Sequence, residues 1–164
     1  MLNNRPLYVG NFKPIKDIIV PEPVLDEVTI GTQTWKTSYL AIDDGKGEID
    51  YNETTGLYYY TTSSANRVAN TIDGWHLPTT DEINTLLNYI GSQNKAIISV
   101  DDGGTDIYGL DLRLAGMKYG GYGYIGTYGF IMTTTYLWMF GLNTSQYYNS
   151  SVRQGNIRLI KDAT

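Results

Sequence analysis

The pattern of hydrophobic and polar positions predicts one well-defined helix, between Pro78 and Gly91. Four apolar residues are spaced at i, i+3, i+4 and i+7 and so share one helical face: Ile83, Leu86, Leu87 and Ile90. Thr79 and Glu82 have the spacing of a capping box, and Gly91 is suited to end the helix. We therefore expect a helix that packs this stripe against a core.

Upstream of this helix, the pattern predicts short strands, turns and one shorter helix. The expected elements are a hairpin of 28–30 and 33–36, a turn over 42–47, a strand over 57–60 and a helix over 63–70 with Ala65, Val68 and Ala69 on its core face. After Ala96 no helical period follows, and we expect loops and short antiparallel strands, ending with 158–161. The sequence therefore predicts an α+β fold.

Prolines separate an N-terminal arm from the rest of the chain. Four of the five prolines precede residue 24, so residues 1–25 are expected to be extended, and 26–164 to form one domain. The arm is too apolar for a solvated linker, so we expect it to dock on a partner or to add a strand to its own domain. The residues expected to anchor it to a partner are Leu2, Arg5, Leu7, Tyr8 and Phe12.

Composition excludes several classes of function. The net charge of −5 and the lack of a basic run argue against nucleic-acid binding. No apolar stretch approaches the roughly 20 residues that span a bilayer, and the N-terminus lacks a signal-peptide core. Cysteine is absent, which removes disulfides, thiolate metal sites and thiol nucleophiles. We expect a protein that folds in the cytoplasm without membrane insertion.

Tyrosine is unusually frequent, at 15 residues against 3 Phe, and this balance is typical of a binding surface. The tract 119–124 predicts either a flexible loop or irregular strand, or an exposed aromatic contact loop. Along 136–140 the alternation leaves open whether Tyr136 and Trp138 face a partner or the core. The candidate ligand-binding residues are Tyr122, Tyr124, Tyr136, Trp138, Asn143, Tyr147 and Tyr148.

Catalytic and metal-binding signals are weak. His76 is the only histidine, and we expect it to hold the turn before the capped helix. The acidic segment 101–106 could hold calcium, but it lacks the EF-hand pattern, and a solvated turn is the preferred interpretation, as for Asp43 and Asp44. Glu48 and Asp50 have no cleft assigned to them. We therefore predict no enzyme activity, no metal and no cofactor.

Several segments resemble the Fibrobacter succinogenes major paralogous domain, a bacterial module of C-type-lectin-like fold. The resemblance covers about 28–162 and excludes the arm. The matching segments are TIGTQTW at 29–35, GWHLPT at 74–79, DIYGL at 106–110, LAG at 114–116, GFIMTTT at 129–135 and RLIKD at 158–162. The resemblance implies a C-type-lectin-like domain with short antiparallel strands and two helices.

The chain departs from this family at informative positions. Thr71 and Leu159 stand where members commonly carry cysteines, and Ile131 or Met132 replaces an expected tryptophan. The calcium-dependent sugar-binding signatures of C-type lectins are also missing. A chain without cysteine is suited to assembly in a reducing cytosol, as for phage structural proteins.

Together these features predict a non-enzymatic binding module on a phage virion surface. The arm would anchor a fibre or capsid-decoration protein to a capsid or tail protein, and the lectin-like domain would bind host glycans or proteins. By analogy with fibres we expect a homo-oligomer, with a trimer favoured. The alternative is a bacterial surface or secreted polysaccharide-binding adhesin domain.

Overall fold

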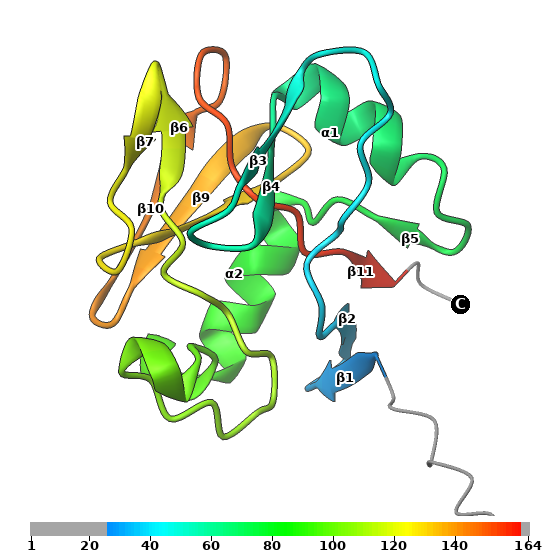
Figure 1. Cartoon of the computed structure of the whole chain (residues 1–164). Coiled ribbons are helices and arrows are strands. Elements are labelled where there is room, and N and C mark those ends of the chain that lie inside the picture. The colour runs from blue at the N-terminus through cyan, green and yellow to red at the C-terminus, as the bar shows by residue number, and fades with distance from the viewer. Residues whose placement is uncertain (1–25, 162–164) are drawn as a thin grey trace, which may run out of the picture.

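The computed structural model describes residues 26–161, which form an α+β fold (Figure 1). The described chain has two α-helices, α1 (Thr62–Ala69) and α2 (Thr80–Tyr89), among several small antiparallel sheets. The predicted α+β class is confirmed. The proposed anchoring residues Leu2, Arg5, Leu7, Tyr8 and Phe12 lie outside the described residues, so their role stays a prediction.

The largest sheet joins the two ends of the described chain. Its strand order is β1-β2-β11-β5, with bounds β1 Glu27–Ile30, β2 Gln33–Lys36, β11 Ile160–Lys161 and β5 Trp75–His76. Figure 1 shows β11 next to β2 and β5, although it lies more than 80 residues away from both in sequence. The expected hairpin of β1 and β2 is confirmed, with Gly31 at φ 63° in its turn.

A second sheet and two hairpins carry the middle of the chain. The three-stranded sheet has the order β10-β9-β8, with β8 Gly129–Met132, β9 Tyr136–Gly141 and β10 Thr144–Asn149. The hairpins pair β3 (Ile49–Asn52) with β4 (Leu57–Tyr60), and β6 (Met117–Tyr119) with β7 (Gly121–Gly123). Two short 3₁₀ turns, η1 (Asn94–Ala96) and η2 (Val100–Asp102), lie between α2 and β6. Neither of these was expected from the sequence.

Both helices begin and end close to their predicted limits. Thr79 caps α2 by accepting from the backbone N of Glu82 at 3.2 Å, and its own N donates to Oε2 of Glu82 at 2.8 Å. This is the predicted capping box. Gly91 follows the helix at φ 61°, a conformation that glycine adopts without steric cost. Helix α1 is capped by Thr61 and buries the predicted stripe of Ala65, Val68 and Ala69.

The three-stranded sheet is covered on both faces. One core contains Trp138 and Phe140 of β9 together with Ile83 and Leu86 of α2. The other contains Leu137 and Met139 of β9, and it includes Val68 and neighbouring residues of α1. Five consecutive residues of β9 are therefore buried, rather than every second one. This settles the open question about 136–140, because Trp138 is only 1% exposed and is a core residue instead of a surface ligand contact.

Within the described chain, no helix has the length and apolar character needed to cross a lipid bilayer.

Candidate functional site: an aromatic groove

The tyrosine–glycine tract forms the ordered hairpin β6–β7, held against the rest of the domain. Lys118 of β6 exchanges backbone hydrogen bonds with Gln154, in the segment between β10 and β11, at 3.0 and 2.9 Å. Its ammonium lies 2.6 Å from Oδ1 of Asp50 on β3. Tyr119 and Gly121 pair across the turn. The tract therefore forms strands, with Tyr119, Tyr122 and Tyr124 exposed, and a contact with a ligand stays a prediction.

Tyr122 ties this hairpin to β3 and β4. Its ring meets that of Tyr59 edge-on at a centroid distance of 5.0 Å, and its hydroxyl donates to the carbonyl of Tyr51 at 3.4 Å. Tyr59 is itself fixed by a hydrogen bond from its hydroxyl to the carbonyl of Ala115. Burial raises the pKa of the Tyr122 phenol, so the group remains a neutral hydrogen-bond donor in neutral solution.

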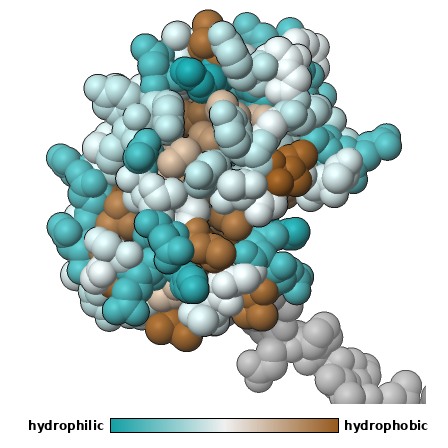
Figure 2. Space-filling model, turned by 90° about the vertical axis from the view of Figure 1, so that its left-hand side faces the viewer, coloured by the Kyte–Doolittle hydropathy of each residue, from teal (hydrophilic) through white to brown (hydrophobic). Residues whose placement is uncertain are grey.

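Two adjoining hollows lie between this hairpin, the three-stranded sheet and the segment after β10. Their volumes are about 300 and 380 Å³, and they share Met117, Tyr124 and Arg153. We call them together the tyrosine groove. Figure 2 views this side of the molecule, where apolar atoms lie between paler side chains. The groove is lined by Met117, Tyr119, Gly121, Tyr122, Gly123, Tyr124, Tyr128, Phe130, Met139, Thr144, Gln146, Tyr148 and Arg153.

Tyr124 occupies the middle of the groove in an unusual backbone conformation. Its φ is 64°, a left-handed value that costs a residue with a Cβ on the order of 1 kcal/mol. Its ring is 55% exposed and lies 5.8 Å from the ring of Tyr128 and 6.0 Å from that of Phe130. The fold thus holds a large aromatic side chain at the surface where a glycine would be less strained.

Arg153 brings a positive charge to the aromatic wall. Its guanidinium carbon lies 5.4 Å from the ring centre of Tyr119 and 5.7 Å from that of Tyr148. Nη1 donates to the carbonyl of Asn149 at 3.0 Å. Both ring distances are within the range of a cation–π contact. The two rings and the carbonyl therefore hold the guanidinium where the two hollows adjoin.

The predicted ligand-binding residues separate onto different parts of the fold. Tyr122, Tyr124 and Tyr148 line the tyrosine groove. Tyr136 and Tyr147 pair at 6.2 Å on the other side of the sheet, where the Tyr147 hydroxyl lies 2.9 Å from Oδ1 of Asn84 on α2. The reason is the strand period of two, which sends Tyr147 and Tyr148 to opposite faces of β10.

Two other predicted residues also lie outside the groove. Trp138 is in the core, with its indole N–H donated to Oγ of Ser145. Asn143 is exposed in the turn between β9 and β10, one residue before Thr144, and does not line the groove.

Sequence reasoning missed Arg153, Tyr128 and the apolar floor of Phe130 and Met139. A signal for the arginine is nevertheless present in the chain. Residues 112–161 contain five Lys or Arg and no Asp or Glu, although the whole chain is acidic. This part of the sequence, which contains every residue that lines the groove, therefore carries basic residues without acidic neighbours in the chain.

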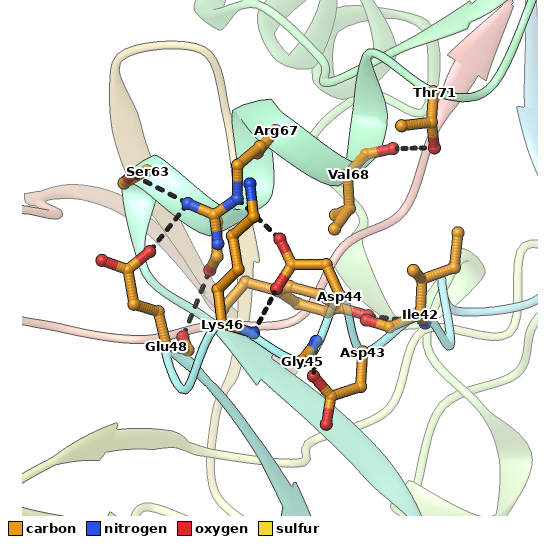
Figure 3. A network of polar contacts seen from close by, with 12 residues as sticks. Ile42, Asp43, Asp44, Gly45, Lys46, Glu48, Ser63, Arg67, Val68 and Thr71 are labelled. Atoms are coloured by element: carbon orange, nitrogen blue, oxygen red, sulfur yellow. Dashed lines mark hydrogen bonds and ion pairs between the residues drawn. The ribbon is translucent and has the colours of Figure 1, made fainter.

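Several of the acidic residues considered as metal or catalytic candidates have partners within the fold. Asp44 and Glu48 both reach Arg67 of α1, at 2.6 and 2.8 Å (Figure 3). Asp102 pairs with Arg113 at 3.0 Å, and Asp106 accepts from the backbone N of Asp111. Among residues 26–161, no three His, Asp or Glu side chains gather as a metal site.

His76 lies on β5, where Nε2 is 2.9 Å from Oε1 of Glu82, the capping-box residue. It thus contacts the start of α2, next to the turn that it was expected to hold.

Comparison with known proteins identifies no relative: no family model, no curated protein and no solved structure matches the chain. The site is therefore interpreted from its own geometry.

Proposed function

We propose that this chain is a non-enzymatic binding module whose tyrosine groove binds a saccharide on a cell surface. The observation that carries the proposal is the groove itself, whose two hollows are together lined by five tyrosines, with Phe130 and Met139 in the floor of one of them. A tyrosine ring offers a flat apolar face for the C–H face of a sugar and a hydroxyl for its polar edge. Tyr124 and Tyr148 both line one hollow, where their rings lie 6.0 and 6.5 Å from the ring of Phe130.

Preorganisation of the groove supports a binding role. The hairpin that forms one wall is held by Tyr122 and by the Lys118–Asp50 ion pair, and the other wall belongs to the three-stranded sheet. Side chains that are already ordered lose less entropy when a ligand binds. The strained backbone of Tyr124 is also typical of a functional position.

The proposal also includes the fold, the virion location and the oligomeric state that the sequence predicts. We propose a C-type-lectin-like fold related to the Fibrobacter succinogenes major paralogous domain, on the strength of GWHLPT and the segments that accompany it. In this proposal the protein is a fibre or capsid-decoration protein on a phage virion, assembled in the host cytoplasm as a homo-oligomer, with a trimer favoured. A bacterial surface or secreted adhesin domain is the alternative, which the same groove would serve.

Binding of the full chain to an array of bacterial surface polysaccharides tests the proposed groove. We expect Tyr148→Ala to weaken binding by about ten-fold or more, as for truncation of a central contact residue. Tyr136→Ala is the matched control, because Tyr136 is 44% exposed on the opposite side of the sheet. Equal losses for the two variants, or no binding by the native chain, would contradict the proposal.

Tyr124→Gly provides a second variant that separates binding from folding. It removes a groove ring and also relieves the left-handed backbone strain at φ 64°. We expect it to lose saccharide binding without a loss of thermal stability.

A further inference from the structure

We propose that the tyrosine groove selects acidic saccharides, and that Arg153 binds the carboxylate of the sugar. This inference rests on the proposed function and adds the chemical class of the ligand. It follows from the distribution of charge around the groove and from the hydrogen bonds that Arg153 makes and lacks.

The charges around the groove differ from those of the whole chain. The chain has 17 acidic and 12 basic residues, yet none of the 13 residues that line the groove is Asp or Glu, and Arg153 is the one charged residue among them. The nearest carboxylate on the β3 side, Asp50, is neutralised by Lys118 at 2.6 Å and also accepts from Gln154. An anion that enters the groove therefore meets one cation and no unpaired carboxylate.

The other four basic residues in 112–161 already have partners. Arg113 pairs with Asp102, Lys118 with Asp50 and Lys161 with Glu27. Arg158 is buried, with its guanidinium 4.0 Å from the ring centre of Tyr39 and hydrogen bonds to two backbone carbonyls. Arg153 has no carboxylate within ion-pair distance in the described part of the chain, so its charge is available to a ligand.

The hydrogen-bonding capacity of Arg153 is mostly unused. A guanidinium has five N–H donors, and the described residues accept one hydrogen bond from it, at the carbonyl of Asn149. Nε is covered and has no partner, which leaves the terminal nitrogens to meet a ligand. Tyr119 and Tyr148 fix the guanidinium plane from its flanks, so little side-chain entropy is lost when an anion binds.

A carboxylate on a sugar ring fits this arrangement better than a neutral hydroxyl. A carboxylate neutralises the cation and accepts charge-assisted hydrogen bonds, whereas a hydroxyl accepts weaker ones and leaves the charge uncompensated. With the carboxylate at Arg153, the ring of a hexuronate would lie over the floor of Phe130 and Met139, next to Tyr124 and Tyr148. The groove thus offers a cation to the carboxylate of an acidic sugar and an apolar surface to its ring.

Matched pairs of oligosaccharides test the assignment with the full chain. The probes are oligogalacturonate, oligomannuronate and hyaluronan fragments, each in its native form and after reduction of the carboxyl groups to alcohols. Dissociation constants are measured by titration calorimetry at low salt. We expect at least one native acid to bind about ten-fold more tightly than its reduced form, the size of one charge-assisted hydrogen bond.

Arg153→Gln is expected to abolish this preference while keeping binding of the reduced sugar. Lys95→Gln is the matched control, because Lys95 is exposed on η1 and does not line the groove. Inorganic phosphate, added as a competitor at the concentration of the native acid, is expected to displace it poorly. Equally strong competition would show a general anion site and overturn the carboxylate assignment.

The outcomes also separate this inference from the proposed function. If the native and reduced forms bind equally and Tyr148→Ala weakens both, the groove binds saccharides and the selection by Arg153 is wrong. If Arg153→Gln keeps the preference for the acid, the carboxylate contacts another residue and the inference is again wrong. If none of these probes binds, the selection for acids is wrong; if the array of polysaccharides also shows no binding, the saccharide-binding groove is contradicted as well.

Discussion

Arg67 and Arg153 show how differently two arginines can be used in one small domain. Arg67 donates from Nε to Asp44 and from Nη1 to Glu48 and Ser63, so it fastens the loop 43–48 to α1 (Figure 3). Arg153 has ring and carbonyl contacts but no such acidic partners in residues 26–161. The charge of the first arginine is paired within the fold, and the second retains the capacity to bind an anion.

The Arg67 network predicts a pH-dependent contribution to stability. The hydrogen bond from Arg67 lowers the pKa of Asp44 below its ordinary value of 3.8. A carboxyl whose pKa is lowered in the folded state stabilises the fold above its unfolded pKa, and this contribution disappears as the pH falls through the folded value. In urea denaturation, Asp44→Asn should therefore be less stable than the native chain at pH 7, with the difference shrinking progressively below about pH 3.8.

Asp43→Asn is the control for this prediction. Asp43 is exposed, and its carboxylate accepts from the backbone N of Gly45 within the same turn. Its replacement should leave the pH dependence close to that of the native chain. A difference for Asp44→Asn that stays constant from pH 7 to pH 2 would show that the lost stability does not come from the charge of Asp44.

Gly129 of strand β8 is packed so closely that even an added methyl group should destabilise the fold. A Cβ at Gly129 would lie 2.1 Å from Cζ of Phe140 and 2.5 Å from the carbonyl oxygen of Arg113. Neither a buried aromatic ring nor a backbone carbonyl can yield that far without moving the strand. Gly129→Ala should lower the free energy of unfolding by about 1–3 kcal/mol, the usual cost of overpacking. Gly121 of β7 is the control, because it has open space around its Cα. Gly121→Ala should change the free energy of unfolding by about 0.5 kcal/mol or less in the same denaturation experiment.

The elements also differ in how far the sequence predicts them. The limits of α2 depend on residues close together in the chain, namely the Thr79–Glu82 box and the stripe that starts at Ile83, so local reasoning was sufficient. The faces of β9 depend on α1 and α2, which approach it from opposite sides, and no local pattern contains that information. For the same reason the sequence alone does not show that Trp138 is buried while Tyr136 is exposed.

At the scale of the whole molecule, the site is harder to predict than the fold. The tyrosine groove joins β6–β7, the three-stranded sheet and the segment that carries Arg153, three parts that are brought together only by tertiary packing. The excess of tyrosine indicated a binding surface but could not show which tyrosines share it. The acid-free region 112–161, which contains all the residues that line the groove, is the one further signal that the sequence offers for it.

The proposed virion role predicts that anchoring and saccharide binding can be separated within one chain. The groove is small, at about 300 and 380 Å³ for its two hollows, so one copy should bind weakly and many copies on a particle should bind strongly. A full chain with Leu7→Ser, Tyr8→Ser and Phe12→Ser should fail to sediment with phage particles, yet should keep the saccharide affinity of the native chain. Tyr148→Ala should show the reverse, with normal sedimentation and lost saccharide binding. If the triple variant still sediments with particles, these residues do not anchor the chain. If it loses saccharide affinity, they contribute to the binding domain rather than to a separate attachment.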